Sequence, residues 1–173
     1  MKLLALISLA TLVWASGEYS NRRAPGFSLA DSHYQQHDPQ DYRGKVLLID
    51  IMATNCPTCM KLADTLVELK AKYKDRIGLI SIVTLPDNQS TAEKFAAEYK
   101  VTWPIVFDQG QVIMSYLKVT PSNPQVHFPH LFVIDPDGTI KNDFAGTEDK
   151  SLTLDALSAE IDRLTTKPAR SQL

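Results

Sequence analysis

Residues 45–59, KVLLIDIMATNCPTC, decide the fold of this chain. The first part, 46–51, is apolar except for Asp50. A continuous apolar run of this length is typical of a strand that is buried on both faces, and such strands belong to parallel or mixed sheets covered by helices. The last part holds both cysteines of the chain, Cys56 and Cys59, so two thiols are expected where this strand ends.

A helix is expected directly after that strand, over 57–73. Pro57 suits the first turn of a helix, where its missing N–H costs no hydrogen bond. Apolar residues then recur at helical spacing; they are Leu62, Leu66, Leu69 and Tyr73. Cys56 should therefore lie at the start of the helix and Cys59 one turn inside it, facing the core.

Strands and helices alternate along the rest of the chain. Apolar and β-branched runs predict strands over 77–84, 103–107, 131–134 and 139–144, and apolar periodicity predicts helices over 111–117 and 154–164. The sequence STAE at 90–93 is a capping-box pattern and predicts the start of a further helix. The sequence DPDG at 135–138 favours a type I turn between the last two strands. This order predicts an α/β fold with a central mixed sheet flanked by helices.

The composition suggests one ordinary globular domain. The chain has 173 residues, of which 44% are hydrophobic and 22% charged, and its net charge is −2. Because no basic tract or acidic tail occurs, neither nucleic acid nor an anionic membrane surface is expected as a partner. We expect a flexible N-terminal segment over 18–26, the domain over 27–166 and a tail over 167–173, in a monomeric protein.

The first 17 residues have the pattern of a signal peptide. Lys2 precedes an apolar run over 3–14, which small residues close at 15–17. This run is shorter than the roughly 20 apolar residues that span a bilayer. We therefore expect a periplasmic or secreted protein that is not stably inserted in a membrane after the signal is cleaved.

The spacing of the two cysteines favours chemistry over a structural role. A disulfide that closes so short a loop stabilises a fold little, whereas a thiol at a helix start has a lowered pKa and attacks disulfides. Cys56 is therefore the expected nucleophile, and Cys59 would then resolve the mixed disulfide by forming the Cys56–Cys59 disulfide. Asp50, alone in an apolar strand, should have a raised pKa and could take the proton of Cys59.

Two motifs resemble those of the thioredoxin superfamily, and within it the exported TlpA/ResA-like thiol-disulfide oxidoreductases, which are related to the AhpC/TSA redoxins. Residues 41–59 resemble the family stretch GKVVLVNFWATWCPPC, and residues 129–138, PHLFVIDPDG, resemble PTTFLIDPEG. The resemblance covers about 27–164. It implies a thioredoxin-like fold for 27–166, with an N-terminal edge-strand extension near 27–29 and a central strand–helix insertion.

The resemblance also implies a surface that binds a partner protein. Phe128–Pro129 should be a cis peptide bond facing the cysteines. The residues expected to contact the partner are Phe128, Pro129, His130, Asn55, Pro57 and Thr58. Asn55 stands where the family usually has tryptophan. His130 replaces a small residue, and two roles are open for its ring: contact with the Cys56 sulfur or a cap at a strand end.

The expected activity is the reduction of disulfides in client proteins, for example during cytochrome c or copper-protein maturation. An upstream thiol donor, such as a membrane reductase, would recharge the protein, and no cofactor or metal is expected. The main alternative is a copper chaperone that uses Cys56, Cys59 and either His127 or His130. A peroxiredoxin is disfavoured because Ile49 and Ala53 replace the proline and threonine that peroxide binding requires. A non-catalytic interaction domain also remains open, and His33 and His37 are expected in an exposed loop.

Overall fold

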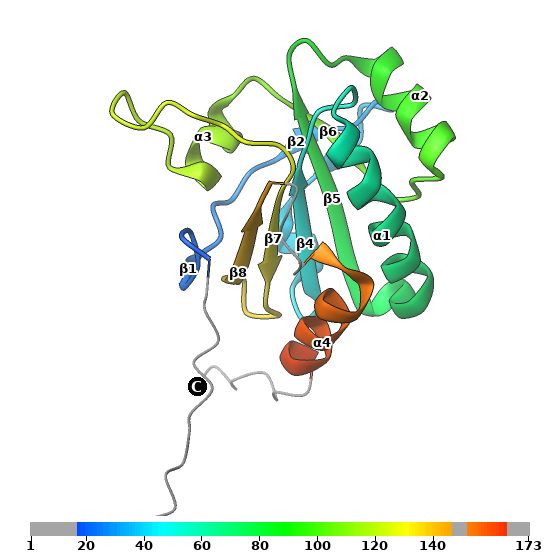
Figure 1. Cartoon of the computed structure of the whole chain (residues 1–173), viewed down its shortest axis with the longest axis vertical. Coiled ribbons are helices and arrows are strands. Elements are labelled where there is room, and N and C mark those ends of the chain that lie inside the picture. Colours follow the sequence, from blue (N-terminus) through cyan, green and yellow to red (C-terminus); the bar gives the residue numbers. More distant parts are fainter. Residues whose placement is uncertain (1–16, 147–151, 166–173) are drawn as a thin grey trace, which may run out of the picture.

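A computed structural model describes residues 17–146 and 152–165. Its centre is a six-stranded sheet in the order β1-β8-β7-β4-β5-β6 (Figure 1). The strands are β1 (Arg22–Arg23), β4 (Val46–Ile51), β5 (Ile77–Thr84), β6 (Ile105–Asp108), β7 (His130–Ile134) and β8 (Thr139–Ala145). β4, β5 and β6 are parallel, whereas β7 runs antiparallel to β4 and β8, so the sheet is mixed as expected.

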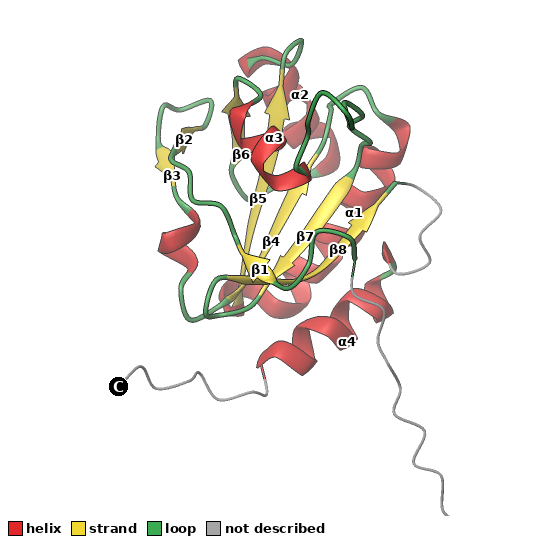
Figure 2. Cartoon of the chain, turned by 90° about the vertical axis from the view of Figure 1, so that its left-hand side faces the viewer, coloured by secondary structure: helices red, strands yellow, loops and turns green. Residues whose placement is uncertain are grey.

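Helices cover both faces of this sheet (Figures 1 and 2). α1 (Pro57–Tyr73), α2 (Gln89–Tyr99) and α4 (Leu154–Thr165) lie on one face, and α3 (Gln111–Leu117) lies on the other. Two short 3-10 helices, η1 (Pro39–Tyr42) and η2 (Lys74–Arg76), precede β4 and β5. β6 and α3 follow each other in the middle of the chain, and the expected α/β fold with a central mixed sheet flanked by helices is confirmed.

The pleat of β4 sends its side chains alternately to the two faces. Val46 and Leu48 pack with α1 and α4, whereas Leu47 and Ile49 pack with α3. By the same alternation Asp50 faces the α1 side of the sheet. The strand therefore carries its carboxyl group to the layer that holds the cysteine helix.

The N-terminal segment differs from the expected arrangement. Residues 18–26 were expected to be flexible, but β1 pairs with β8 at the sheet edge, and the Tyr19 N–H donates to Asp143 at 2.9 Å. β2 (Leu29–Ala30) does not join the main sheet as an edge strand. It pairs with β3 (Gln36–His37) in a small hairpin, whose Asp31 bridges to Val106 of β6. The polar residues of this segment suggested a loose structure. Its tertiary partners could not be foreseen because they are distant in sequence.

The start of α2 also differs from the sequence expectation. The helix begins at Gln89, and Asn88 rather than Ser90 is its N-cap. The Asn88 side chain accepts the N–H groups of Ser90 and Thr91, while the Thr91 hydroxyl accepts the Asn88 N–H. Asparagine is at least as good an N-cap as serine, so the earlier residue takes the position.

The expected signal peptide, except for Gly17, and the expected tail lie outside the described residues. Within 17–146 and 152–165, no helix has the length and apolar character needed to cross a bilayer.

Candidate functional site: a dithiol at the start of α1

Cys56 is the N-cap residue of α1. Its sulfur accepts the Cys59 N–H at 3.3 Å, lies 3.0 Å from the Thr58 hydroxyl and is 3.9 Å from the Phe128 carbonyl oxygen. Partial burial opposes ionisation, but the hydrogen bonds from Cys59 and Thr58 outweigh it and lower the pKa of Cys56. The half-buried sulfur is therefore both reachable and readily ionised, which is what a thiol nucleophile needs.

Cys59 lies one turn further along α1 and is fully buried. Burial raises its pKa, and the hydrogen bond with Cys56 and the nearby Asp50 charge add to the effect. Both cysteines are free thiols in the structure. The two sulfurs thus have opposite properties: one ionises easily at the surface, and the other needs help to lose its proton.

Asp50 is the acidic group that acts electrostatically on Cys59 from beneath the helix. Its side chain is 1% exposed, and burial raises its pKa to about 7 against a weaker opposing effect of the Ser81 hydrogen bond. The Ser81 hydroxyl lies 3.4 Å from Oδ2, while Oδ1 has no hydrogen-bond partner among the described residues. Asp50 can therefore change its protonation state near neutral pH, as a proton acceptor must.

The cis peptide bond expected at Phe128–Pro129 is confirmed. Phe128 packs against the same apolar cluster as Cys56, and Pro129 is buried beside it in sequence. Asn55 and Pro57, the neighbours of Cys56 in sequence, are exposed. The residues that the sequence suggested for partner binding therefore flank the nucleophile in two segments, 55–58 and 128–129.

His130, the first residue of β7, has a partner that the sequence did not suggest. Its Nε2 lies 3.1 Å from Oδ2 of Asp143, and its ring stacks on Phe132 with the centroids 4.6 Å apart. Tyr19 covers the ring from the N-terminal segment, at 5.5 Å between centroids. The strand pleat turns His130 toward the α3 face of the sheet, whereas Cys59 lies on the α1 face.

Three side chains that sequence reasoning missed hold the loop before Cys56. The Asp87 carboxylate accepts the Thr54 N–H at 3.0 Å and the hydroxyl groups of Thr54 and Thr91. Asp87 belongs to the loop after β5, which also contains a second cis bond at Leu85–Pro86 and the exposed side chain of Leu85. The sign of this contact is that Asp87 is buried although it belongs to a loop. The sequence alone does not show that burial, so it could not predict the contact.

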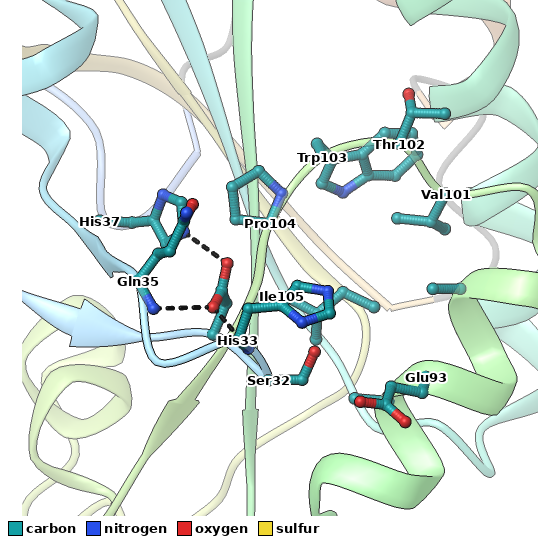
Figure 3. A pocket seen from close by; sticks show the side chains of 13 residues that line it. Ser32, His33, Gln35, His37, Glu93, Val101, Thr102, Trp103, Pro104 and Ile105 are labelled. Carbon is teal, nitrogen blue, oxygen red and sulfur yellow. Dashed lines mark hydrogen bonds and ion pairs between the residues drawn. The ribbon is translucent and has the colours of Figure 1, made fainter.

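His33 and His37 line a cavity of about 480 Å³ between the β2–β3 hairpin, α2 and the segment 101–105 (Figure 3). His33 is exposed as expected, but His37 belongs to β3, and its Nε2 contacts Oδ2 of Asp31 at 2.9 Å. Asp31 also accepts the N–H groups of His33 and Gln35. Within the described ranges, no group of three or more histidine, cysteine or acidic side chains is arranged to hold a metal ion.

The fold and the cysteine pair together define a thioredoxin-fold protein with a Cys-x-x-Cys dithiol. The family model described as Redoxin matches residues 19–161. The thiol-disulfide oxidoreductase ResA of Geobacillus kaustophilus is 32% identical over 127 residues, which cover 73% of this chain and 70% of ResA. The thioredoxin-like protein YneN of Bacillus subtilis is 24% identical over 136 residues, or 78% of this chain and 76% of YneN.

Solved structures agree on the fold. A thiol:disulfide interchange protein of the thioredoxin family from Chlorobium tepidum has a TM-score of 0.71 at 15% identity, covering 83% of this chain and 96% of that one. A putative protein disulfide isomerase from Bacteroides thetaiotaomicron has a TM-score of 0.73 at 21% identity, covering 86% of this chain and 91% of the other.

The chain belongs to the Redoxin family, as a ResA-like member of the thioredoxin superfamily. With Cys56 and Cys59 arranged as a reactive and a buried thiol, it is a thiol-disulfide oxidoreductase with a Cys-x-x-Cys centre.

Proposed function

We propose that this protein reduces disulfides in client proteins outside the cytoplasm. The observation that carries the proposal is the asymmetry of the two thiols: the Cys56 sulfur accepts a helix N–H at the surface, while Cys59 is buried beside Asp50. Nothing in this chemistry requires a cofactor. The pattern of residues 1–17 and the similarity to ResA support export, and the periplasm or the outside of the cell is the proposed location.

The first step is attack by the Cys56 thiolate on one sulfur of a client disulfide. A Cys56–client disulfide forms, and the second client sulfur leaves as a thiolate. The lowered pKa of Cys56 increases the share of thiolate near neutral pH. Exposed Asn55 and Pro57 and half-buried Thr58 on one flank, and Phe128 and Pro129 on the other, would hold the client backbone.

The second step is release of the client by Cys59. Its thiol gives its proton to the Asp50 carboxylate, and the resulting thiolate attacks the Cys56 sulfur. The Cys56–Cys59 disulfide forms, and the remaining client sulfur leaves as a thiolate. The client has then gained two electrons and this protein has lost two, so a dithiol donor must reduce it again. A membrane reductase would fit that requirement.

Reduction is the favoured direction because Pro57 and Thr58, the residues between the cysteines, carry no positive charge. A cation there would further stabilise the thiolate and make the protein a stronger oxidant. Equilibration of the protein with glutathione measures the potential directly. We expect a value well below about −150 mV, and a more positive value would show an oxidant instead.

Insulin reduction by a dithiol provides the test of activity. We expect the wild type to accelerate it and Cys56→Ser to lose the acceleration entirely. Cys59→Ser, the matched control with the nucleophile intact, should accumulate the mixed disulfide with insulin, visible on a non-reducing gel. Equal activity of Cys56→Ser and wild type would contradict the proposal.

A further inference from the structure

Two buried side chains connect to Asp50 from behind the dithiol. The Trp103 indole Nε1–H donates to the Ser81 hydroxyl oxygen at 2.9 Å, and that hydroxyl lies 3.4 Å from Oδ2 of Asp50. Ser81 is 1% exposed and Trp103 is 7% exposed. Ser81 is the direct neighbour of Asp50 in the parallel β4–β5 pairing, so backbone register holds the two side chains together.

The chemistry of these groups decides which one donates in each hydrogen bond. An indole N–H can only donate, so the Ser81 oxygen must be the acceptor in the contact with Trp103. The hydroxyl hydrogen of Ser81 is then free to point to Asp50, whose Oδ2 accepts it. Trp103 thereby orients Ser81, and Ser81 orients one oxygen of Asp50.

The other carboxyl oxygen of Asp50 is left for the reaction. Oδ1 is buried and has no hydrogen-bond partner among the described residues. A neutral carboxylic acid accepts hydrogen bonds best through its carbonyl oxygen. With Oδ2 accepting from Ser81, the acidic proton therefore belongs on Oδ1.

We infer that Ser81 and Trp103 are positioning residues that keep Oδ1 of Asp50 free to take the proton of Cys59. The inference rests on the proposed function, because it concerns the step in which Cys59 releases the client. The Cys59 S–H bond breaks, an O–H bond forms at Oδ1, and the Cys59 thiolate attacks the Cys56 sulfur.

Trp103 does not carry the proton itself, because its indole cannot accept one in exchange. The residue also forms part of the wall of the 480 Å³ cavity between α2 and the β2–β3 hairpin (Figure 3). None of the residues that flank Cys56 lines this cavity. A change at Trp103 should therefore reach Asp50 without altering the surface that binds the client.

The groups around Asp50 make a pH measurement interpretable. Cys59, on α1, is the titratable group whose pKa the charge of Asp50 affects. The neighbours of Asp50 in strand register are Ser81 on β5 and Leu131 on β7, and Trp103 contacts Ser81 from behind. None of these three side chains carries a charge. The pH dependence of client release should therefore follow Asp50 and Cys59.

The test follows the two thiols separately with a chromogenic aromatic disulfide. One equivalent reacts with reduced protein: attack by Cys56 releases the first coloured thiolate, and attack by Cys59 on the Cys56 mixed disulfide releases the second. Rates of both phases are measured between about pH 6 and pH 9 for wild type, Ser81→Ala, Trp103→Phe and the conservative control Ser81→Thr.

Loss of the Ser81 hydrogen bond should raise the pKa that governs the second phase by about one unit. Ser81→Ala should then slow the second phase about five-fold at pH 7, with the first phase unchanged. Ser81→Thr keeps a hydroxyl and should restore the wild-type profile. Trp103→Phe should shift the profile in the same direction by a smaller amount.

A Ser81→Ala profile with an unshifted pKa, or equal slowing of both phases, would overturn the inference. An unshifted profile in Trp103→Phe would remove Trp103 from it. Failure of the proposed function looks different: wild type would then release no second thiolate, or Asp50→Asn would release it as fast as wild type does.

Discussion

Asp50 on β4 and Asp143 on β8 are both nearly removed from water, with 1% and 6% of their surface exposed, yet burial leaves them in opposite states. Burial raises the pKa of Asp50 to about 7, since the only effect that opposes it is one long hydrogen bond from Ser81. Burial also works against ionisation of Asp143, but hydrogen bonds from His130 and Ser20 outweigh it and lower the pKa.

The two carboxyl groups also lie on opposite faces of the same sheet. Asp50 faces α1, whereas Asp143 pairs in register with Phe132 on the α3 face. Oδ1 of Asp143 accepts from the Tyr19 N–H at 2.9 Å and the Ser20 hydroxyl at 2.7 Å. The supply of donors, rather than the depth of burial, therefore decides which aspartate serves the fold and which is available for proton transfer.

The largest effect is expected from Asp143→Ala. Removal of the carboxylate leaves the buried His130 ring, the Tyr19 N–H and the Ser20 hydroxyl without their hydrogen-bond partner, which should lower the free energy of unfolding at pH 7 by about 3–5 kcal/mol. The lowered pKa of Asp143 means that its stabilisation is present above the unfolded value near 4 and is lost as pH falls. Urea unfolding at pH 7 and at about pH 2 to 3, below the unfolded pKa of an aspartate, measures both effects.

The matched control is Asp137→Ala, which removes an exposed carboxylate in the β7–β8 turn. It should change the free energy of unfolding by no more than about 0.5 kcal/mol. A cost below about 1 kcal/mol for Asp143→Ala would mean that the contacts of Asp143 do not hold the N-terminal segment and β7 together.

Asp50→Asn should act in the opposite direction. A carboxyl group whose pKa rises from 3.8 unfolded to about 7 folded loses stability as pH increases between those values. The substitution should therefore stabilise the reduced protein by about 2–4 kcal/mol at pH 8 and by almost nothing at pH 4. Unfolding of both proteins across this range measures the difference, and a pH-independent difference would contradict a raised pKa.

The smallest effect in this comparison is expected from Ser20→Ala. It removes one of the donors to Asp143 and leaves His130 and the Tyr19 N–H in place, so the cost should be about 1 kcal/mol. Ser115→Ala, in an exposed position of α3, is the control and should be neutral. Urea unfolding of both variants checks the result. Equal stability of both variants would mean that the hydrogen bond from Ser20 to Asp143 does not stabilise the protein.

Much of the site could be predicted because its parts are adjacent in sequence. The apolar run of β4, the helix period of α1 and the two cysteines between them lie within 46–73, so local rules were sufficient. The same run marked Asp50 as a polar exception, and the structure confirms its burial. The partners of Asp50 were not predictable, because Ser81 and Trp103 meet it only through strand register and a loop far along the chain.

His130 and Asp143 show the same limit at another place. The sequence offered two roles for His130 but not the partner that the structure gives it, because strand pleating directs the ring toward an aspartate on β8. The expected flexible segment failed for a related reason, since its donors find their acceptor about 120 residues away.

The sequence by itself determined the α/β order, the strand–turn–helix that carries the dithiol, and the family to which that motif belongs. Each of these depends on periodicity and spacing between near neighbours. Only the tertiary structure decided which buried carboxyl group is supplied with donors and which is left with an unpartnered oxygen, because hydrogen-bond supply depends on side chains that folding brings together from distant strands.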